Sequence, residues 1–197
     1  RRRKCAGMAF DHSESVMNIR ATGAPGPVTV DFFRSFTATR PDEERWELLE
    51  GVMVLNPQPA FLHQIVADNV VRLLNAAIVK AGLHRFALST PGIDLQRIVP
   101  GREFAPDVAV LDRNLDLTKN RTTVCYLAVE VISPSDARRD TGSRRKRIEV
   151  KRETYRMLPD CSVVITIAQK KVEVTVETRV DGEWDQRVFA SLDEVIE

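Results

Sequence analysis

The chain has 197 residues, of which 43% are hydrophobic and 29% are charged; this composition is typical of one globular domain and excludes a disordered or fibrous protein. Its 29 Lys and Arg residues balance its 28 Asp and Glu residues, so net charge does not indicate a nucleic-acid partner. No apolar run approaches the roughly 18 residues of a membrane span, and we expect no membrane association.

The cysteines predict a reducing environment. Cys5, Cys125 and Cys161 are odd in number and form no CxxC pair. This pattern argues against a disulfide framework and against a thiolate zinc site. We therefore expect a cytoplasmic protein.

The amino-terminal part divides into a tail and the start of a domain. Residues 1–27 are punctuated by Gly and Pro and are expected to form a loose tail before a single domain over residues 28–197. Thr29 is suited to cap a short helix that runs through Phe36.

A hairpin and a long helix are predicted next. The segment 46–55, WELLEGVMVL, has two apolar runs around Glu50 and Gly51, and glycine supplies the positive φ of a tight turn. The segment 60–81 has a clear helical period and stops at Gly82. The apolar residues of this period are Leu62, Ile65, Val66, Val70, Leu73, Leu74, Ala77, Ile78 and Ala81.

The remaining elements predict an α/β fold with a mixed sheet. β-like runs cover residues 84–89, 92–99, 104–111 and 123–132. The last run is apolar almost throughout, as a central strand buried on both faces would be. A turn-rich loop over 133–140 leads into a basic helix over about 143–158, and a second hairpin is expected over 162–167 and 171–178.

Glu130 interrupts the most hydrophobic of the predicted strands. Because side chains alternate along a strand, Glu130 shares a face with Ala128 and Ile132. A bare carboxylate on a buried face is costly, and its pKa rises unless a cation or hydrogen-bond donors compensate. The residue therefore indicates either a functional carboxylate or a structural salt bridge to a buried arginine.

Asp107 is a second carboxylate within an apolar run. It follows Pro106, which cannot donate to a β-ladder and so marks the beginning of a strand or a bulge. If this strand pairs with that of Glu130, the two carboxylates lie close together, and a bound Mg²⁺ or Mn²⁺ would relieve their repulsion. Taken alone, an aspartate just after a proline is most often a turn or capping residue.

Lys151 breaks the pattern of the basic helix. Ile148, Lys151 and Tyr155 follow each other at steps of three and four, so Lys151 shares the face that packs on the sheet. An ammonium there can stabilise charge developing on a phosphorane-like transition state, or orient an attacking water. The alternative is a solvated lysine, because the surrounding sequence is rich in basic residues: Arg144, Arg145, Lys146, Arg147 and Arg152.

Together these motifs resemble a known family. The motifs are ELLEGVMVLNP, the following His-Gln pair, PDVAVL, and EVISPSD with a later D, K and Y. They resemble the Uma-type bacterial restriction endonuclease family of the PD-(D/E)XK nuclease superfamily. The resemblance covers residues 46 to 176 and is most specific in EVISPS with its upstream PD. It implies a restriction-endonuclease-like core with flanking helices, and a metal ion held by Asp107, Glu130 and the backbone carbonyl of Val131.

The lysine of the resembling pattern has two candidates. In the superfamily it lies two residues after the glutamate, where this chain has Ile132. The family commonly places it on the next helix, four residues before a tyrosine, and Lys151 with Tyr155 matches that spacing. Asp140 matches an aspartate of the intervening loop. Additional basic residues after Asp140 make Lys146 a competing candidate.

Two further residues match family positions. Glu50 either reaches the metal through water or shapes its own turn. His63 either serves the site or is a polar residue that meets solvent where the long helix begins.

The sequence thus predicts metal-dependent hydrolysis of phosphodiester bonds, in DNA, by Asp107, Glu130 and Lys151. A homodimer is expected by analogy alone. The alternatives are a catalytically inactive nuclease-fold module that binds nucleic acid or regulates, and an interaction domain whose carboxylates form a buried ion-pair network. Sequence-independent phosphate contacts are expected from the basic residues of the loop and helix: Arg138, Arg139, Arg144, Arg145, Lys146, Arg147 and Arg152.

Overall fold

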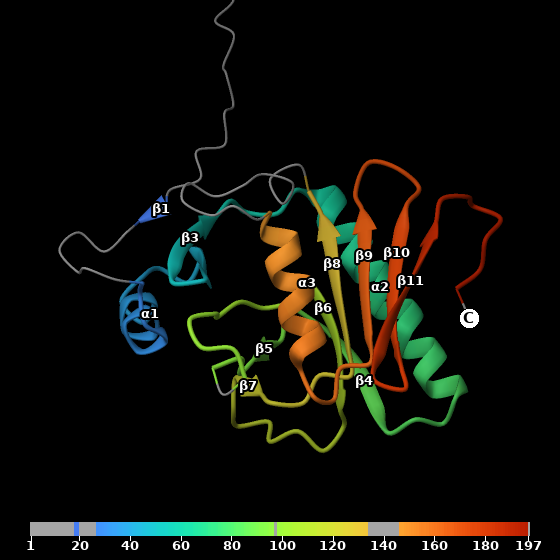
Figure 1. Ribbon diagram of the computed structural model, residues 1–197, viewed down its shortest axis with the longest axis horizontal. Helices are drawn as coiled ribbons and strands as arrows, with labels where there is room; N and C mark the ends of the chain where they lie inside the picture. The colour runs from blue at the N-terminus through green and yellow to red at the C-terminus, as the bar shows by residue number, and fades with distance from the viewer. Residues whose placement is uncertain (1–17, 20–26, 97, 134–145, 197) are drawn as a thin grey trace, which may run out of the picture.

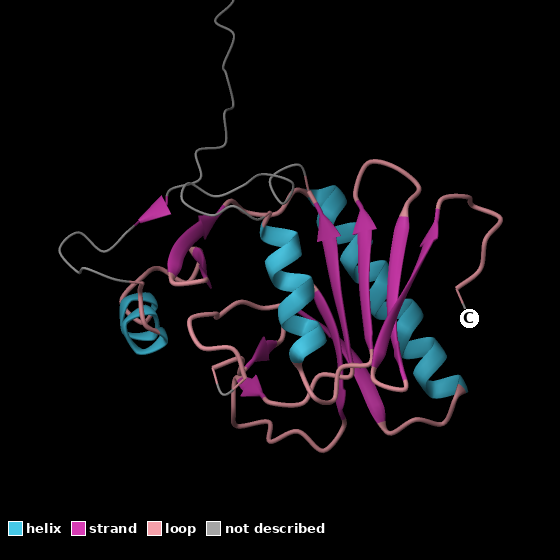
Figure 2. Cartoon of the chain, in the orientation of Figure 1, coloured by secondary structure: helices cyan, strands magenta, loops and turns pink. Residues whose placement is uncertain are grey.

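The computed structural model describes residues 18–19, 27–96, 98–133 and 146–196. Within them lie three helices, a six-stranded mixed sheet, a three-stranded sheet and a pair of two-residue strands (Figures 1 and 2). The α/β class predicted from the sequence is confirmed. No helix in these ranges has the length and apolar content that crossing a membrane would require.

The six-stranded sheet has the order β11–β10–β9–β8–β6–β4. Only β8 and β9 are parallel neighbours within it, and α3 (Arg147–Met157) connects them in a crossover. The strands are β4 (Arg85–Ser89), β6 (Val108–Asp112), β8 (Leu127–Ile132), β9 (Val163–Ala168), β10 (Val174–Val180) and β11 (Glu183–Phe189).

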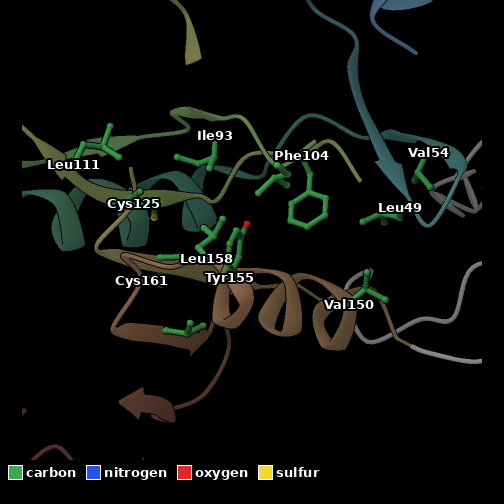
Figure 3. Close-up of a cluster of buried hydrophobic side chains, with 14 residues drawn as sticks. Leu49, Val54, Ile93, Phe104, Leu111, Cys125, Val150, Tyr155, Leu158 and Cys161 are labelled. Carbon is green, nitrogen blue, oxygen red and sulfur yellow. The ribbon is translucent and has the colours of Figure 1, made fainter. Parts of the chain in front are cut away.

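Two helices cover opposite faces of this sheet (Figure 1). On one face, α2 (Phe61–Lys80) packs over Val129 and Val131 of β8. On the other, Val150, Tyr155 and Leu158 pack with Ala128 in a core cluster (Figure 3). Because both faces are covered, β8 is buried along most of its length, as its apolar sequence predicts.

A smaller sheet lies beside this core. It has the order β1 (Asn18–Ile19), β3 (Val52–Asn56), β2 (Arg45–Leu49), and α1 (Val30–Thr37) packs against it. The predicted cap is confirmed, since the Thr29 side chain accepts a hydrogen bond from the Phe32 amide at 3.2 Å. Paired backbone hydrogen bonds between Leu48 and Glu103, at 2.8 and 2.9 Å, join β2 to the segment that leads to Asp107.

The predicted β2–β3 hairpin is also confirmed. Glu50 and Gly51 both have positive φ, 50° and 77°, the combination that a two-residue turn of the mirror-image type requires. The Gly51 carbonyl accepts a hydrogen bond from the Val28 amide at 2.9 Å. A Cβ on Gly51 would overlap Pro27, so glycine is required here for both conformation and space.

Several predicted strands have different bounds. The run 92–99 forms only β5 (Gly92–Ile93), which pairs with β7 (Arg121–Thr122) before the chain turns. The run 104–111 begins its strand only at Val108, because Pro106 cannot join the ladder. β11 was not predicted, since its polar sequence lacks the apolar alternation of a half-buried strand.

The long helix and the tail also depart from expectation. α2 packs on the sheet along a narrow stripe, and Leu62, Ile65 and Leu73 are 46%, 57% and 57% exposed although they fit the helical period. The expected loose tail contains one short strand, β1, which pairs with β3. The rest of that tail, residues 1–17 and 20–26, lies outside the described residues.

Replacing Gly51 with alanine should destabilise the hairpin more than a positive φ alone explains. Gly182 is the matched control, because its φ is 89° but a Cβ there would meet nothing within 4 Å. Alanine at either position should cost about 1–2 kcal/mol for the left-handed conformation. The overlap with Pro27 should add roughly 1 kcal/mol or more at Gly51. Urea unfolding measures both, and equal losses would contradict the close contact.

Candidate active site

Asp107 and Glu130 lie side by side at one end of the six-stranded sheet. Val108 pairs with Val129, so Asp107, which directly precedes β6, is level with Glu130. The pairing of β6 and β8 ends there, and the Val131 amide instead donates to Asp107 Oδ2 at 2.7 Å. The predicted neighbouring carboxylates are therefore brought together, with Asp107 placed before the strand.

Glu130 is buried, with 4% of its surface exposed. The Tyr155 hydroxyl donates to Oε1 at 2.5 Å, and Lys151 Nζ donates to Oε2 at 3.2 Å. Burial raises the pKa of Glu130 to about 8, assisted by the negative charges of Asp107 and Glu47 and opposed by Lys151 and Tyr155. Burial and Glu130 also raise the pKa of Tyr155 well above its usual value, so its phenol stays a donor.

Lys151 lies between two carboxylates. It is 6% exposed, and its Nζ also contacts Glu47 Oε1 at 2.8 Å. The predicted face of α3 is confirmed, since Ile148, Lys151 and Tyr155 are all buried against the core. The lysine therefore serves as the shared cation of Glu47 and Glu130.

Glu47 is a site residue that sequence reasoning missed. It lies on β2 in the smaller sheet, two residues after Arg45, and its side chain reaches Lys151. The available signal was a carboxylate between Trp46 and Leu48 in an apolar strand, the same kind of violation that singled out Glu130.

His63 contacts Asp107 across the first turn of α2. Its Nε2 is 3.1 Å from Asp107 Oδ1. Burial by itself would raise the pKa of Asp107, but the His63 hydrogen bond, the charge of Lys151 and the Val131 amide outweigh it and hold that pKa below its usual value. Of the two interpretations of His63, the structure supports a place in the site.

These side chains face a pocket of about 340 Å³. Its lining residues come in part from the first turn of α2, from α3 and from the end of β8. Figure 1 shows the amino ends of α2 and α3 and the carboxyl end of β8 at the upper edge of the sheet. The pocket is lined by Arg45, Glu47, Asn56, Pro57, Gln58, Pro59, Ala60, His63, Asp107, Glu130, Ser133, Lys151, Gln169 and Lys170.

The accessory candidates Glu50 and Lys146 lie outside the site pocket. Glu50 is not among the pocket residues; its Oε1 binds Arg102 at 2.9 Å, which supports the turn-shaping interpretation. Lys146 is exposed at the start of α3, where its amide donates to Glu149 at 3.1 Å, whereas Lys151 is in the pocket. Asp140 lies outside the described residues.

The basic residues of α3 are engaged within the protein. Arg147 is buried and donates to Asn56 Oδ1 at 2.9 Å, so it is not the solvent-facing phosphate contact that the sequence suggested. Arg152 donates to Glu177 at 2.7 Å and to Gln186 at 3.0 Å. Of the other predicted contacts, Lys146 is exposed, and Arg138, Arg139, Arg144 and Arg145 lie outside the described residues.

Comparison with known proteins agrees with this fold. The model of the Uma2 family, described as "Putative restriction endonuclease", matches residues 30–197. A solved structure, "a putative nuclease belonging to DUF820 from Anabaena variabilis ATCC 29413", has the same fold with a TM-score of 0.63 and 16% identity. The alignment covers 87% of this chain and 89% of that one. No curated protein matches the sequence.

The raised pKa of Glu130 predicts a pH-dependent stability. A carboxyl whose folded pKa is about 8 and whose ordinary value is 4.5 binds its proton more tightly in the folded state. Without metal, stability should therefore fall as pH rises from about 4.5 to about 8, by up to about 1.4 kcal/mol per pH unit. The Glu130→Gln variant should not show this fall in stability with rising pH. Denaturant unfolding of both proteins in EDTA across this range measures it, and identical pH profiles would refute it.

Proposed function

The chain belongs to the Uma2 family, and we propose that it is a metal-dependent endonuclease that hydrolyses phosphodiester bonds in DNA. The observation that supports this most is the convergence of Glu47, Asp107 and Glu130 on one pocket around Lys151. Three acidic side chains share one lysine, so a divalent cation would compensate the negative charge that their ionised forms carry. The homodimer and the cytoplasmic location expected from the sequence stay predictions.

The donor set fits a magnesium site completed by water. Within the described ranges no three His, Cys, Asp or Glu side chains form a ready-made metal centre. Mg²⁺ is commonly bound through one or two carboxylates with several waters and substrate phosphates, so a fully protein-built cage is not needed. Asp107 and Glu130 would supply the carboxylates of such a site.

The backbone carbonyl of Val131 is a suitable third ligand. The amide and carbonyl of one strand residue point to the same side, and the Val131 amide points to Asp107. When bound, Mg²⁺ or Mn²⁺ supplies Lewis acidity, polarising a phosphate oxygen and lowering the pKa of bound water.

The protein residues then have distinct roles. Lys151 offers a buried ammonium, which orients the attacking water or stabilises the extra negative charge on the phosphate. Glu47 also binds that ammonium, so Glu47 and Glu130 together fix its position. Tyr155 and His63 fix the Glu130 and Asp107 carboxylates by hydrogen bonds, which limits their freedom to rotate.

Cleavage of supercoiled plasmid DNA tests the proposed function. The wild-type protein should nick it with Mg²⁺ or Mn²⁺ and not with EDTA, and Asp107→Ala should abolish nicking. Mn²⁺ should also raise the melting temperature of the wild type, because a ligand of the native state stabilises it, and Asp107→Ala should remove this rise. If the wild type neither nicks the plasmid nor changes its melting temperature with metal, the proposed nuclease function is rejected. Metal binding and DNA gel shifts without nicking would favour an inactive nuclease-fold module.

The assignment of the lysine is tested with a matched pair. Lys151→Gln should lower the nicking rate by about 100-fold or more, the usual loss when one donor to developing charge is removed. Lys146→Gln removes the same charge from an exposed position and should cleave like the wild type. If Lys146→Gln is the inactive variant and Lys151→Gln is active, the assignment is reversed.

A further inference from the structure

Two basic side chains line the site pocket without a partner among the described residues. Neither Arg45 nor Lys170 makes a side-chain hydrogen bond or ion pair with any part of the chain that the structure describes, and both border the pocket. Two other side chains of the pocket that can donate are engaged, Lys151 with two glutamates and His63 with Asp107. Arg45 and Lys170 are thus available to a ligand.

Arg45 approaches the pocket from the smaller sheet. It is the first residue of β2, and because it lies two residues before Glu47 it shares that residue's face. Glu47 contacts Lys151, so this face of β2 is the one directed at the site. Arg45 also pairs with Asn56 in the β2–β3 ladder, and Asn56 lines the same pocket.

Lys170 approaches from the six-stranded sheet. It is exposed in the turn between β9 and β10, at the upper edge of the sheet in Figure 1. The amide of the preceding residue, Gln169, donates to the carbonyl of Ile132 at 3.2 Å, which ties this turn to the end of β8. Lys170 is therefore held beside the strand that carries Glu130.

The charges of the site explain why such residues are needed. Glu47 and Asp107 bring negative charge to the pocket, and this charge repels a polyanion. The helix arginines cannot offset this repulsion freely, since Arg152 and Arg156 share Glu177, at 2.7 and 3.0 Å. Cations at the border of the pocket have no such competing partner among the described residues.

We propose that Arg45 and Lys170 form a phosphate clamp, in which each residue binds a backbone phosphate of the DNA and so holds the strand over the carboxylates. The clamp rests on the proposed function, and its two residues would bind the DNA substrate of that function. Guanidinium and ammonium groups both form charge-assisted hydrogen bonds with phosphate oxygens. Such contacts position the strand without reading its sequence.

The salt dependence of DNA binding tests the clamp. Arg45→Gln and Lys170→Gln each remove one unpartnered charge. Arg40→Gln and Lys171→Gln are the matched controls, because these nearby residues have the same charges but are paired with Glu44 and Glu173. Binding of a fluorescent duplex of about 20 base pairs is followed by anisotropy in EDTA, which prevents metal-dependent cleavage, at a series of KCl concentrations.

The slope of log K against log [KCl] is negative, and each clamp variant should reduce its magnitude by about 0.9, the double variant by about twice that. The two control variants should keep the wild-type slope. The proposal is overturned if the clamp variants keep the wild-type slope, or if the control variants change the slope as much as the clamp variants do.

Plasmid cleavage by the wild type separates the two proposals. If the wild type cleaves DNA and the clamp variants keep its salt slope, only the clamp is wrong. If the wild type binds DNA without cleaving it and the clamp variants lose slope, the nuclease proposal fails and the clamp stands. A wild type that neither binds nor cleaves DNA contradicts both.

Discussion

The site depends on one buried ammonium shared by two carboxylates, one buried and one half-buried. Lys151 on α3 binds Glu130 of the six-stranded sheet and Glu47 of the smaller sheet, so one side chain connects three parts of the fold. Loss of one partner of a buried ion pair typically costs about 3–5 kcal/mol, because the remaining charge is uncompensated. The position of the smaller sheet and the geometry of the pocket therefore both rely on this contact.

The crossover from β8 through α3 to β9 explains how the lysine reaches the site. A strand lysine two residues after Glu130 is absent, since that position is Ile132. The helix instead packs on the sheet face that bears Glu130 and delivers Lys151 and Tyr155 to its two oxygens. This polar cluster is stable because each of its buried groups has a hydrogen-bond or ion-pair partner. Its acidic side chains outnumber its one lysine, so the cluster can still accept a divalent cation.

Local violations of pattern made part of this site predictable. Asp107, Glu130 and Lys151 each interrupt an apolar face, and periodicity alone is enough to find them. Glu47 interrupts an apolar strand in the same way, but its contact with Lys151 joins residues distant in sequence and no spacing rule reveals it. The contact of His63 with Asp107 is likewise between residues distant in sequence. The basic sequence of α3 suggested a phosphate-binding surface, but composition cannot show that Arg147 is buried or that Arg152 binds Glu177.

A crystal of the protein soaked in Mn²⁺ tests the central claim most directly. The account predicts an anomalous peak between the Asp107 and Glu130 carboxylates, within about 2.0–2.3 Å of their oxygens and of the Val131 carbonyl. Absence of a peak at saturating Mn²⁺, with Lys151 still bound to Glu130, would contradict it and leave a buried ion-pair network in place of a metal centre.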